Sequence, residues 1–424
     1  MGKVLLSGAR VWDGGGSAPF DGDVLVEGNR IRTVSRVRGQ IVASDCQVVE
    51  ARGMTLMPGL VEGHAHLSFE NVTSVEDLIT PPPEEQTLLT ARVAKTLLDH
   101  GFTSAYGASE ARLRLGVAVR NEVDAGRIPG PRIRAGSIEI SVTGAMGDES
   151  RLHNPRTGPA IIVDGPEEMR KAVRLCCREG CDNIKLDVSG DPFYMNCPAD
   201  CTPMSFEEIR MAVETAHSYG RRVNVHTRSI LGTQYSIRAG ADVLYHVEYA
   251  DEQTLDMLEE ARERIFVAPS ISLFHTMLHE ASPWITPEVA RSMGADRMLE
   301  LSAKTHTELR KRGIRHLIGG DYGFAWSKNG TNARDLEFFV KYYGYTPAQA
   351  LRCATQHGGA LMMMGREDKL GEIREGFLAD LLLVDGDPLA DLSMLRNPDR
   401  LAVIMKNGEL YKNARACIPQ RAVA

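Results

Sequence analysis

The chain has 424 residues, of which 43% are hydrophobic, 25% are charged and 6% are aromatic, and its formal net charge is −7 at pH 7. This composition is typical of a globular protein with one large domain and a smaller one. The acidic balance argues against a nucleic-acid partner, and no apolar run approaches the roughly 20 residues that a membrane helix requires.

The N-terminal residues 1–16 combine one lysine with a very short apolar run, so they predict a strand and not a secretory signal. The eight cysteines are irregularly spaced, which is typical of reduced thiols in a cytoplasmic protein. The clusters at 176–181 and 197–201 lack the matching second pair of a zinc ribbon, so we interpret them as structural thiols. We therefore expect a cytoplasmic protein of enzyme size.

Both ends of the chain are rich in short strands. The strand-like ranges are 3–15, 22–37, 368–389 and 401–413. The last of these holds Asn407-Gly408 between apolar runs, which is a strong signal for a β-hairpin. We predict one small β-sandwich domain that is built from residues 1–56 and 365–424.

The middle of the chain, residues 57–364, alternates strand-like and helix-like segments. The predicted strands lie within 55–66, 102–107, 131–141, 182–190, 221–229, 241–250, 264–272 and 314–323. The predicted helices lie within 84–100, 165–180, 205–220, 250–264 and 286–313. Alternation of this kind builds parallel βαβ units, and eight strands favour a (β/α)8 TIM barrel over an open sheet. No glycine-rich nucleotide loop is found.

Polar side chains end several of the predicted barrel strands, on the edge where barrel active sites are built. These residues are His64, His66, Lys185, His226, His246 and Asp321. His64 and His66 are two residues apart, so in a strand both imidazoles leave the same face. A bare H-x-H pair is more often two satisfied polar residues, but recurrence on several strands predicts a metal site.

The residue types fit a pair of divalent cations. Imidazoles and a carboxylate suit Zn²⁺, Mn²⁺ or Co²⁺, with Zn²⁺ as our first choice. Lys185 would fit if its amine took up CO2 to form an anionic carbamate that bridges both cations. Water between two such metals becomes a hydroxide nucleophile near neutral pH. Asp321 can then carry a proton to a leaving nitrogen.

The motifs PGLVEGHAH, NIKLDVSG, VNVHTRS, LYHVEYA, IGGDYG and LGEIREGFLADLLLVDGDPL resemble those of the metal-dependent amidohydrolase superfamily. The chain is most similar to the branch of imidazolonepropionase-like proteins and Xaa-Pro dipeptidases. The resemblance covers nearly the whole sequence, including the terminal β-domain. It implies a hydrolase of carbon–nitrogen bonds that acts on a small molecule as a homo-oligomer.

The resemblance also implies how the metal ligands divide. One cation would be held by His64, His66 and Asp321 and the other by His226 and His246, with carbamylated Lys185 shared. Asp321 and His246 would thus be the catalytic residues at the metals.

The sequence departs from these relatives around the expected substrate pocket. Tyr106 stands where relatives have an arginine, and Met146 stands where they have a histidine. Relatives that cleave dipeptides often have Ala-Tyr where this chain has Thr227-Arg228. Loss of a cationic partner disfavours a substrate carboxylate, because a buried anion needs charge-assisted hydrogen bonds.

We therefore predict a neutral, largely apolar amide, urea or carbamate as substrate, similar to those of phenylurea- and thiocarbamate-hydrolysing members. In the alternative, Arg228 or a loop arginine takes over carboxylate binding, and the protein is an Xaa-Pro-type dipeptidase or an N-acyl amino acid hydrolase. Phe324 and Trp326 would form an aromatic wall, although Trp326 could equally pack only against its loop.

Other functions are less favoured. An imidazolonepropionase-like hydrolase of cyclic amides keeps the fold and changes the bond. A phosphoesterase would need a basic phosphate cradle, which the strand ends do not show. A catalytically silent scaffold would have lost ligands, whereas every ligand type is present here.

Overall fold

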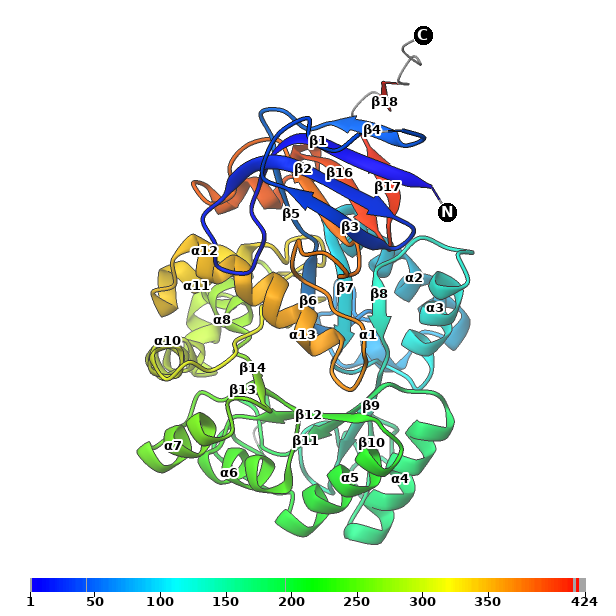
Figure 1. Cartoon of the computed structure of the whole chain (residues 1–424). Coiled ribbons are helices and arrows are strands. Elements are labelled where there is room, and N and C mark those ends of the chain that lie inside the picture. The colour runs from blue at the N-terminus through cyan, green and yellow to red at the C-terminus, as the bar shows by residue number, and fades with distance from the viewer. Residues whose placement is uncertain (1, 43, 195, 415–416, 419–424) are drawn as a thin grey trace.

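The computed structural model describes residues 2–42, 44–194, 196–414 and 417–418. It consists of a β-domain at one end and a barrel surrounded by helices below it (Figure 1). This is the predicted fold, an α/β TIM-like barrel with a β-sandwich domain made by the N- and C-terminal strands. Among the described residues, no helix is both long and apolar enough to cross a membrane.

The β-domain joins both ends of the chain in one sheet, with the strand order β17-β16-β15-β5-β1-β2-β3. Off this path, β4 pairs with β1, and β18 pairs with β4. The strands of this sheet, in chain order, are β1 (Lys3–Val11), β2 (Phe20–Glu27), β3 (Arg30–Ser35), β4 (Gln47–Glu50), β5 (Thr55–Pro58), β15 (Leu381–Val384), β16 (Leu401–Lys406), β17 (Glu409–Asn413) and β18 (Cys417–Ile418). Residue 56, where we predicted the domain to end, lies inside β5, which pairs with both β1 and β15.

The barrel strands are parallel and alternate with helices. They are β6 (Leu60–Ala65), β7 (Phe102–Gly107), β8 (Arg132–Arg134), β9 (Gly136–Ser141), β11 (Asn183–Asp187), β12 (Arg222–Thr227), β13 (Val243–His246) and β14 (Phe266–Ala268), and the short strand β10 (Ala160–Ile162) pairs with β9. The third barrel strand is one run in two parts, because β8 pairs with β7 and β9 pairs with β11.

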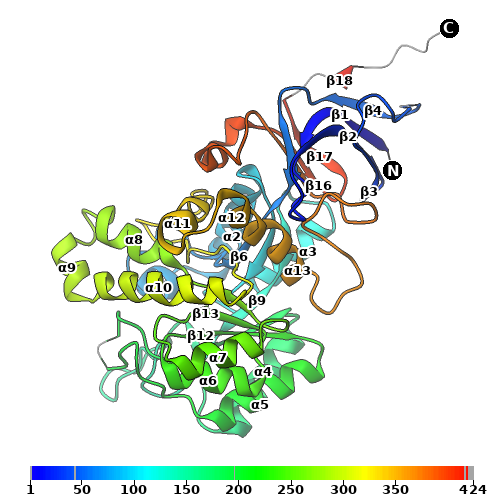
Figure 2. The same cartoon turned by 60° about the vertical axis from the view of Figure 1, so that its left-hand side comes forward.

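The helices cover the outside of the barrel (Figures 1 and 2). They are α1 (Glu76–Ile79), α2 (Pro83–Asp99), α3 (Leu115–Asp124), α4 (Pro166–Arg178), α5 (Phe206–Ser218), α6 (Ile230–Ala239), α7 (Glu252–Glu260), α8 (Ile271–His279), α9 (Pro287–Ser292), α10 (Ala295–Lys311), α11 (Arg334–Tyr343), α12 (Pro347–Arg352) and α13 (Gly358–Met362), with a π-helical turn at Cys353–His357 and 3-10 turns at Leu392–Arg396 and Pro398–Arg400. Several begin at a capping residue, such as Ser205, which forms a capping box with Glu208.

Two predicted elements differ in the structure. The helix expected over 286–313 is divided into α9 and α10 at Gly294, whose φ of 80° breaks the helix. The eighth barrel strand is an extended segment without a continuous ladder. It closes the barrel through a few backbone hydrogen bonds. On one side Val267 N–H donates to Arg315 and Leu317 N–H donates to Val267, and on the other side Gly63 N–H donates to Ile318.

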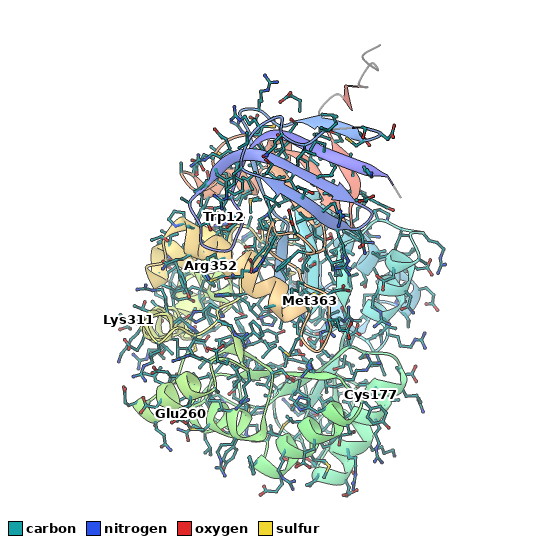
Figure 3. The ribbon with its side chains drawn as sticks, in the orientation of Figure 1. Trp12, Cys177, Glu260, Lys311, Arg352 and Met363 are labelled. Carbon is teal, nitrogen blue, oxygen red and sulfur yellow. The ribbon has the colours of Figure 1, made fainter. Side chains whose placement is uncertain are left out.

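The β-domain and the barrel share an apolar junction. Trp12 is buried between them (Figure 3), and its backbone N–H donates to the carbonyl of Leu56 at 2.9 Å. Its ring belongs to the same buried cluster as Met57 and Leu60, which lead from the β-domain into the first barrel strand. This packing fixes the start of β6, which carries His64 and leads directly to His66.

Candidate active site

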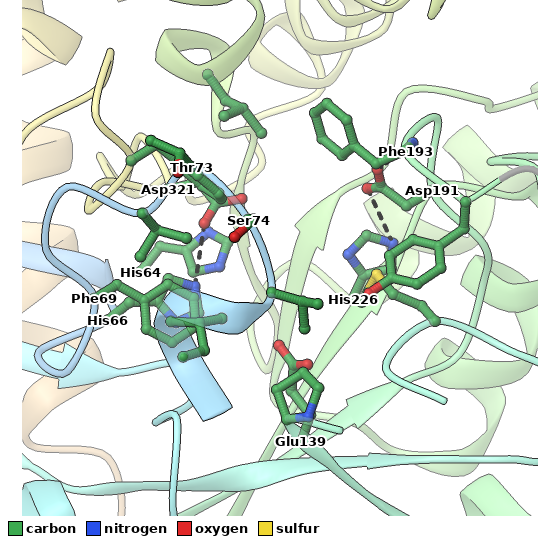
Figure 4. Close-up of a pocket in the computed structure, with 18 of the residues that line it drawn as sticks. His64, His66, Phe69, Thr73, Ser74, Glu139, Asp191, Phe193, His226 and Asp321 are labelled. Carbon is green, nitrogen blue, oxygen red and sulfur yellow. Dashed lines mark hydrogen bonds and ion pairs between the residues drawn. The ribbon is translucent and has the colours of Figure 1, made fainter. Parts of the chain in front are cut away.

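The first barrel strand brings two imidazoles to one edge of the barrel. His64 lies in β6, and His66 follows the end of that strand. One ligand atom from each of His64, His66 and Asp321 lies within 4.8 Å of the others. Figure 4 shows the three side chains together on one side of the pocket. These three residues could therefore hold a metal ion.

Both imidazoles are held through their Nδ1 atoms. Nδ1 of His64 lies 2.8 Å from the hydroxyl of Ser270, and Nδ1 of His66 lies 3.0 Å from the carbonyl oxygen of Ser109. A carbonyl can only accept a hydrogen bond, so His66 donates from Nδ1, and its Nε2 is bare in the neutral ring. Nε2 of His64 is buried and has no hydrogen-bond partner among the described residues. Metal-binding histidines are typically oriented by such contacts.

The close passage of the chain beside β6 explains how Asp321 reaches this group. A Cβ atom at Gly319 would lie 2.6 Å from Cβ of His64, so only glycine allows the approach. Asp321 itself has a left-handed φ of 60°. Burial alone would raise the pKa of Asp321, but His64 and His66 outweigh burial and hold it well below its ordinary value. The carboxylate is therefore ionised.

Two further imidazoles come from β12 and β13, which are neighbouring barrel strands. His226 lies in β12 and His246 ends β13, and their ring centroids are 4.4 Å apart. Nε2 of His226 donates to the carbonyl of Gly190 at 3.0 Å, while Nδ1 of His246 is buried without a partner among the described residues. Burial lowers the pKa of both histidines and of His64, which keeps all three in the neutral form that binds metals.

Lys185 of β11 is 2% exposed and faces the same cavity. Its Nζ lies 3.9 Å from Oδ1 of Asp187 and 5.2 Å from the ring centroid of Tyr245. The Tyr245 ring stacks on His64, with centroids 3.7 Å apart. All six predicted metal ligands thus line one cavity.

The cavity has a volume of about 300 Å³, and its wall away from the ligands is mostly apolar. The apolar and aromatic lining residues are Phe69, Val72, Val75, Leu78, Met146, Pro159, Phe193, Tyr194, Leu273, Ile285, Met293, Phe324 and Trp326. Met146, Phe324 and Trp326 were expected to face the substrate. The rings of Phe324 and Trp326 stack, with centroids 5.4 Å apart, so Trp326 faces the cavity as well as its own loop.

The structure does not bring Tyr106 to this cavity. Its side chain is fully buried in a cluster with Val61 and Phe266 inside the barrel. The charges that act on its hydroxyl include Asp242 and Arg222, which lie at the N-terminal ends of their strands. Tyr106 therefore fills the closed interior of the barrel, as inward side chains in lower layers do.

Arg228 is also absent from the cavity lining, and it is fully buried. Its Nε donates to Asp191 at 2.8 Å and its Nη1 donates to Glu248. Its guanidinium also lies over the Phe274 ring. Two carboxylates neutralise this cation, so it is not free to receive a substrate carboxylate.

Glu139, Asp187 and Asp191 were not singled out from the sequence. Glu139 and Asp191 line the cavity, and Figure 4 shows Glu139 between the His64 side and the His226 side. Glu139 accepts from the Ser109 hydroxyl at 3.1 Å. Asp187 is fully buried, and burial and then Glu139 raise its pKa well above the ordinary value. Glu139 lies near the end of an apolar run in IEIS, and Asp187 does so in LDVSG. This position was the sequence signal that could have identified them.

The fold and the site together define a barrel hydrolase with a metal-competent group at the C-terminal ends of its strands. A sequence profile of the Amidohydrolase family matches residues 55–411. The chain therefore belongs to the Amidohydrolase family and is a hydrolase of carbon–nitrogen bonds.

Known relatives support this assignment. Ochratoxinase of Aspergillus niger is 29% identical over 379 residues, which cover 84% of this chain and 75% of that protein. An imidazolonepropionase of Anaeromyxobacter sp. (strain K) is 24% identical over 93% of this chain and 91% of its own length. The crystal structure of a Xaa-Pro dipeptidase with bound methionine matches with a TM-score of 0.86 and 26% identity, over 97% of this chain and 100% of that chain. The predicted resemblance is confirmed.

Proposed function

We propose that this protein hydrolyses the C–N bond of a small, neutral and largely apolar amide, urea or carbamate at a centre of two divalent cations. The observation that carries the proposal is the convergence of His64, His66, Lys185, His226, His246 and Asp321 at the base of one apolar cavity. The names of the three relatives point to different substrates, so the preference must be argued from this cavity.

The side chains fit a metal centre. Nε2 of His64 and Nδ1 of His246 are buried without partners among the described residues, and an unpaired buried polar atom costs about 1–3 kcal/mol. Nε2 of His66 faces Oδ1 of Asp321 at 3.1 Å, where two lone-pair acceptors would repel each other without a proton or a cation nearby. Imidazole and carboxylate donors suit Zn²⁺, our first choice.

We infer that His64, His66 and Asp321 hold one cation and that His226 and His246 hold the other, with a carbamate on Lys185 between them. The cations would supply a water of lowered pKa and would polarise the carbonyl of the substrate. Asp321 is placed to hold a proton on its carboxylate and to deliver it to the leaving nitrogen. The apolar wall keeps bulk water away from the reacting bond.

A neutral substrate is supported by the charges in the cavity. Among the described residues that line it, Lys185 is the only lysine or arginine. Arg228 is bound by Asp191 and Glu248, and the Glu139 carboxylate lies on the cavity lining. Away from the proposed cations, a substrate carboxylate would therefore meet like charge and no free arginine or lysine side chain.

The test is a matched pair of substrates on zinc-loaded protein. One member is an N-acyl-phenylalanine, and the other is a neutral anilide or phenylurea of similar size. We expect kcat/KM to be higher for the neutral member, and Glu139→Gln should narrow the difference because it removes a repelling charge. Preference for the carboxylate would instead support a dipeptidase or an N-acyl amino acid hydrolase.

Assembly and location remain proposals from the sequence. We infer a homo-oligomer in the cytoplasm. The buried thiols of Cys176, Cys177 and Cys181 support a reducing compartment, because they lie together without disulfides. Size-exclusion chromatography with light scattering, and fractionation of the source cells, would test these two points.

A further inference from the structure

The backbone that follows His246 is held in an unusual conformation. His246 and Val247 have φ angles of 78° and 59°, so two consecutive non-glycine residues are left-handed. Val247 is β-branched and fully buried, which makes this conformation costly. Such strain persists only where the surroundings fix it, and it is frequent at functional sites.

Four hydrogen bonds fix this turn. The N–H groups of Val247 and Tyr249 donate to the carbonyls of Thr227 and Arg228, at 2.9 and 3.1 Å. The carbonyls of His246 and Glu248 point the other way, toward α10. His246 O accepts from Nε2 of His306 at 2.6 Å, and Glu248 O accepts from the Thr305 hydroxyl at 2.8 Å. Adjacent side chains of one helix therefore hold both carbonyls.

His306 is itself held by a buried chain of hydrogen bonds. Its Nδ1 lies 3.0 Å from Nε2 of His316, and Nδ1 of His316 lies 2.7 Å from the hydroxyl of Tyr345. Both imidazoles are fully buried. No carboxylate is hydrogen-bonded to either ring among the described residues, so no negative charge in these contacts offsets the cost of charging them.

With both rings neutral, only one arrangement of protons satisfies this chain. The carbonyl of His246 can only accept, so Nε2 of His306 carries a proton and its Nδ1 is bare. Nε2 of His316 must then donate to His306, and Tyr345 must donate to Nδ1 of His316. The carbonyl of His246 thus sets the tautomers of both imidazoles.

We propose that His306, supported by His316, is a positioning residue that orients His246 toward the second cation. This inference rests on the proposed metal centre. The left-handed turn directs the His246 ring toward His226 and leaves its Nδ1 free, and the bond from His306 holds that turn in place. Supporting contacts of metal ligands commonly change metal affinity 10- to 100-fold when removed.

The test uses three variants and the metal-free protein. His306→Leu removes the donor, and His306→Gln keeps an N–H near the position of Nε2. His275→Leu is the matched control, because His275 is a buried histidine bonded to Tyr342 and away from His246. Zinc binding is measured by titration and by elemental analysis, and stability is measured by urea denaturation of the metal-free forms.

We expect His306→Leu to weaken the second zinc site about 10- to 100-fold. His306→Gln should restore most of that affinity, and His275→Leu should lose stability but bind both zinc ions as the wild type does. ¹⁵N spectra of the wild-type metal-free protein should show His306 and His316 as neutral Nε2–H tautomers. If His306→Leu does not fold, Thr305→Val removes the neighbouring anchor and should weaken the same site.

Two results would overturn this inference while leaving the proposed function intact. In the first, the wild type binds two zinc ions and His306→Leu binds both as tightly as the wild type does. In the second, His275→Leu loses as much zinc affinity as His306→Leu. A different tautomer at His306 would also contradict it, whatever the metal content. Wild-type protein that binds no zinc would instead defeat the proposed function itself.

Discussion

Nε2 of His66 lies 3.1 Å from Oδ1 of Asp321, and Nδ1 of the same ring donates to the carbonyl of Ser109. A neutral His66 ring would therefore present a lone pair to a carboxylate that its surroundings keep ionised. Such an arrangement is stable only when a proton or a cation lies close to both atoms. The contact links the metal-competent group to the residue that we expect to carry the proton.

Asp321→Asn should abolish most of the turnover. An amide cannot accept the proton that the leaving nitrogen needs, so we expect kcat to fall about 10²- to 10⁴-fold. The matched control is Asp385→Asn, which alters a carboxylate whose side chain is 54% exposed. A variant at Asp321 that keeps wild-type kcat with full metal content would contradict the assigned role.

Ser270→Ala should weaken metal binding without unfolding the protein. The Ser270 hydroxyl lies 2.8 Å from Nδ1 of His64 and sets the direction of its Nε2. We expect zinc affinity to fall about 10- to 100-fold, measured by titration of the metal-free protein. Ser302→Ala is the control, because Ser302 is buried and bonded to Tyr343. If Ser270→Ala binds zinc as tightly as Ser302→Ala and the wild type do, Ser270 does not orient His64.

Arg228→Leu should destabilise the fold. The change leaves Asp191 and Glu248 buried without their cation, and breaking a buried pair costs about 3–5 kcal/mol. Urea denaturation measures the loss, with the exposed Arg32→Ala as control. If Arg228 bound a substrate carboxylate instead, stability would change little and KM would rise for carboxylate substrates alone.

Phe324→Ala should raise KM more than it lowers kcat. Phe324 stacks on Trp326 at the cavity wall, and aromatic pairs contribute about 0.5–1.5 kcal/mol beyond the area they bury. For a neutral anilide we expect KM to rise roughly tenfold. Tyr219→Ala removes an exposed ring and serves as control. An unchanged KM would place the substrate elsewhere in the cavity.

The stability of the metal-free protein should depend on pH through His316. Burial holds its pKa well below the ordinary value, so the folded chain keeps the ring neutral where the unfolded chain protonates it. Stability is therefore lost as pH falls below about 6.5, by up to about 1.4 kcal/mol per pH unit. His316→Phe should show a shallower pH dependence between pH 7 and 5. Parallel curves for the two proteins would contradict this account.

The sequence predicted the barrel, the terminal β-domain and all six residues that meet at the base of the cavity. It could do so because strand ends converge in a parallel barrel, whatever the loops between them do. The irregular closing segment was not predicted as such, since Gly319 and Gly320 lie next to an apolar run that looks like an ordinary strand.

The cavity wall was less predictable than its base. Arg228 looked free because its partners, Asp191 and Glu248, are far from it in the sequence. Tyr106 lies on β7, whose inward side chains can either reach the cavity or fill the interior of the barrel below it. Which of the two a residue does depends on strand tilt and register. Glu139 lay outside the motifs that carried the resemblance. These features depend on tertiary packing, which a linear pattern does not encode.

The most direct measurement is the rate of hydrolysis of a neutral anilide by metal-free protein as zinc is added. The proposed centre predicts no turnover without metal and a rate that rises until about two zinc ions are bound per chain. Turnover that is independent of zinc, or no turnover of any amide, urea or carbamate at full loading, would contradict the proposed function.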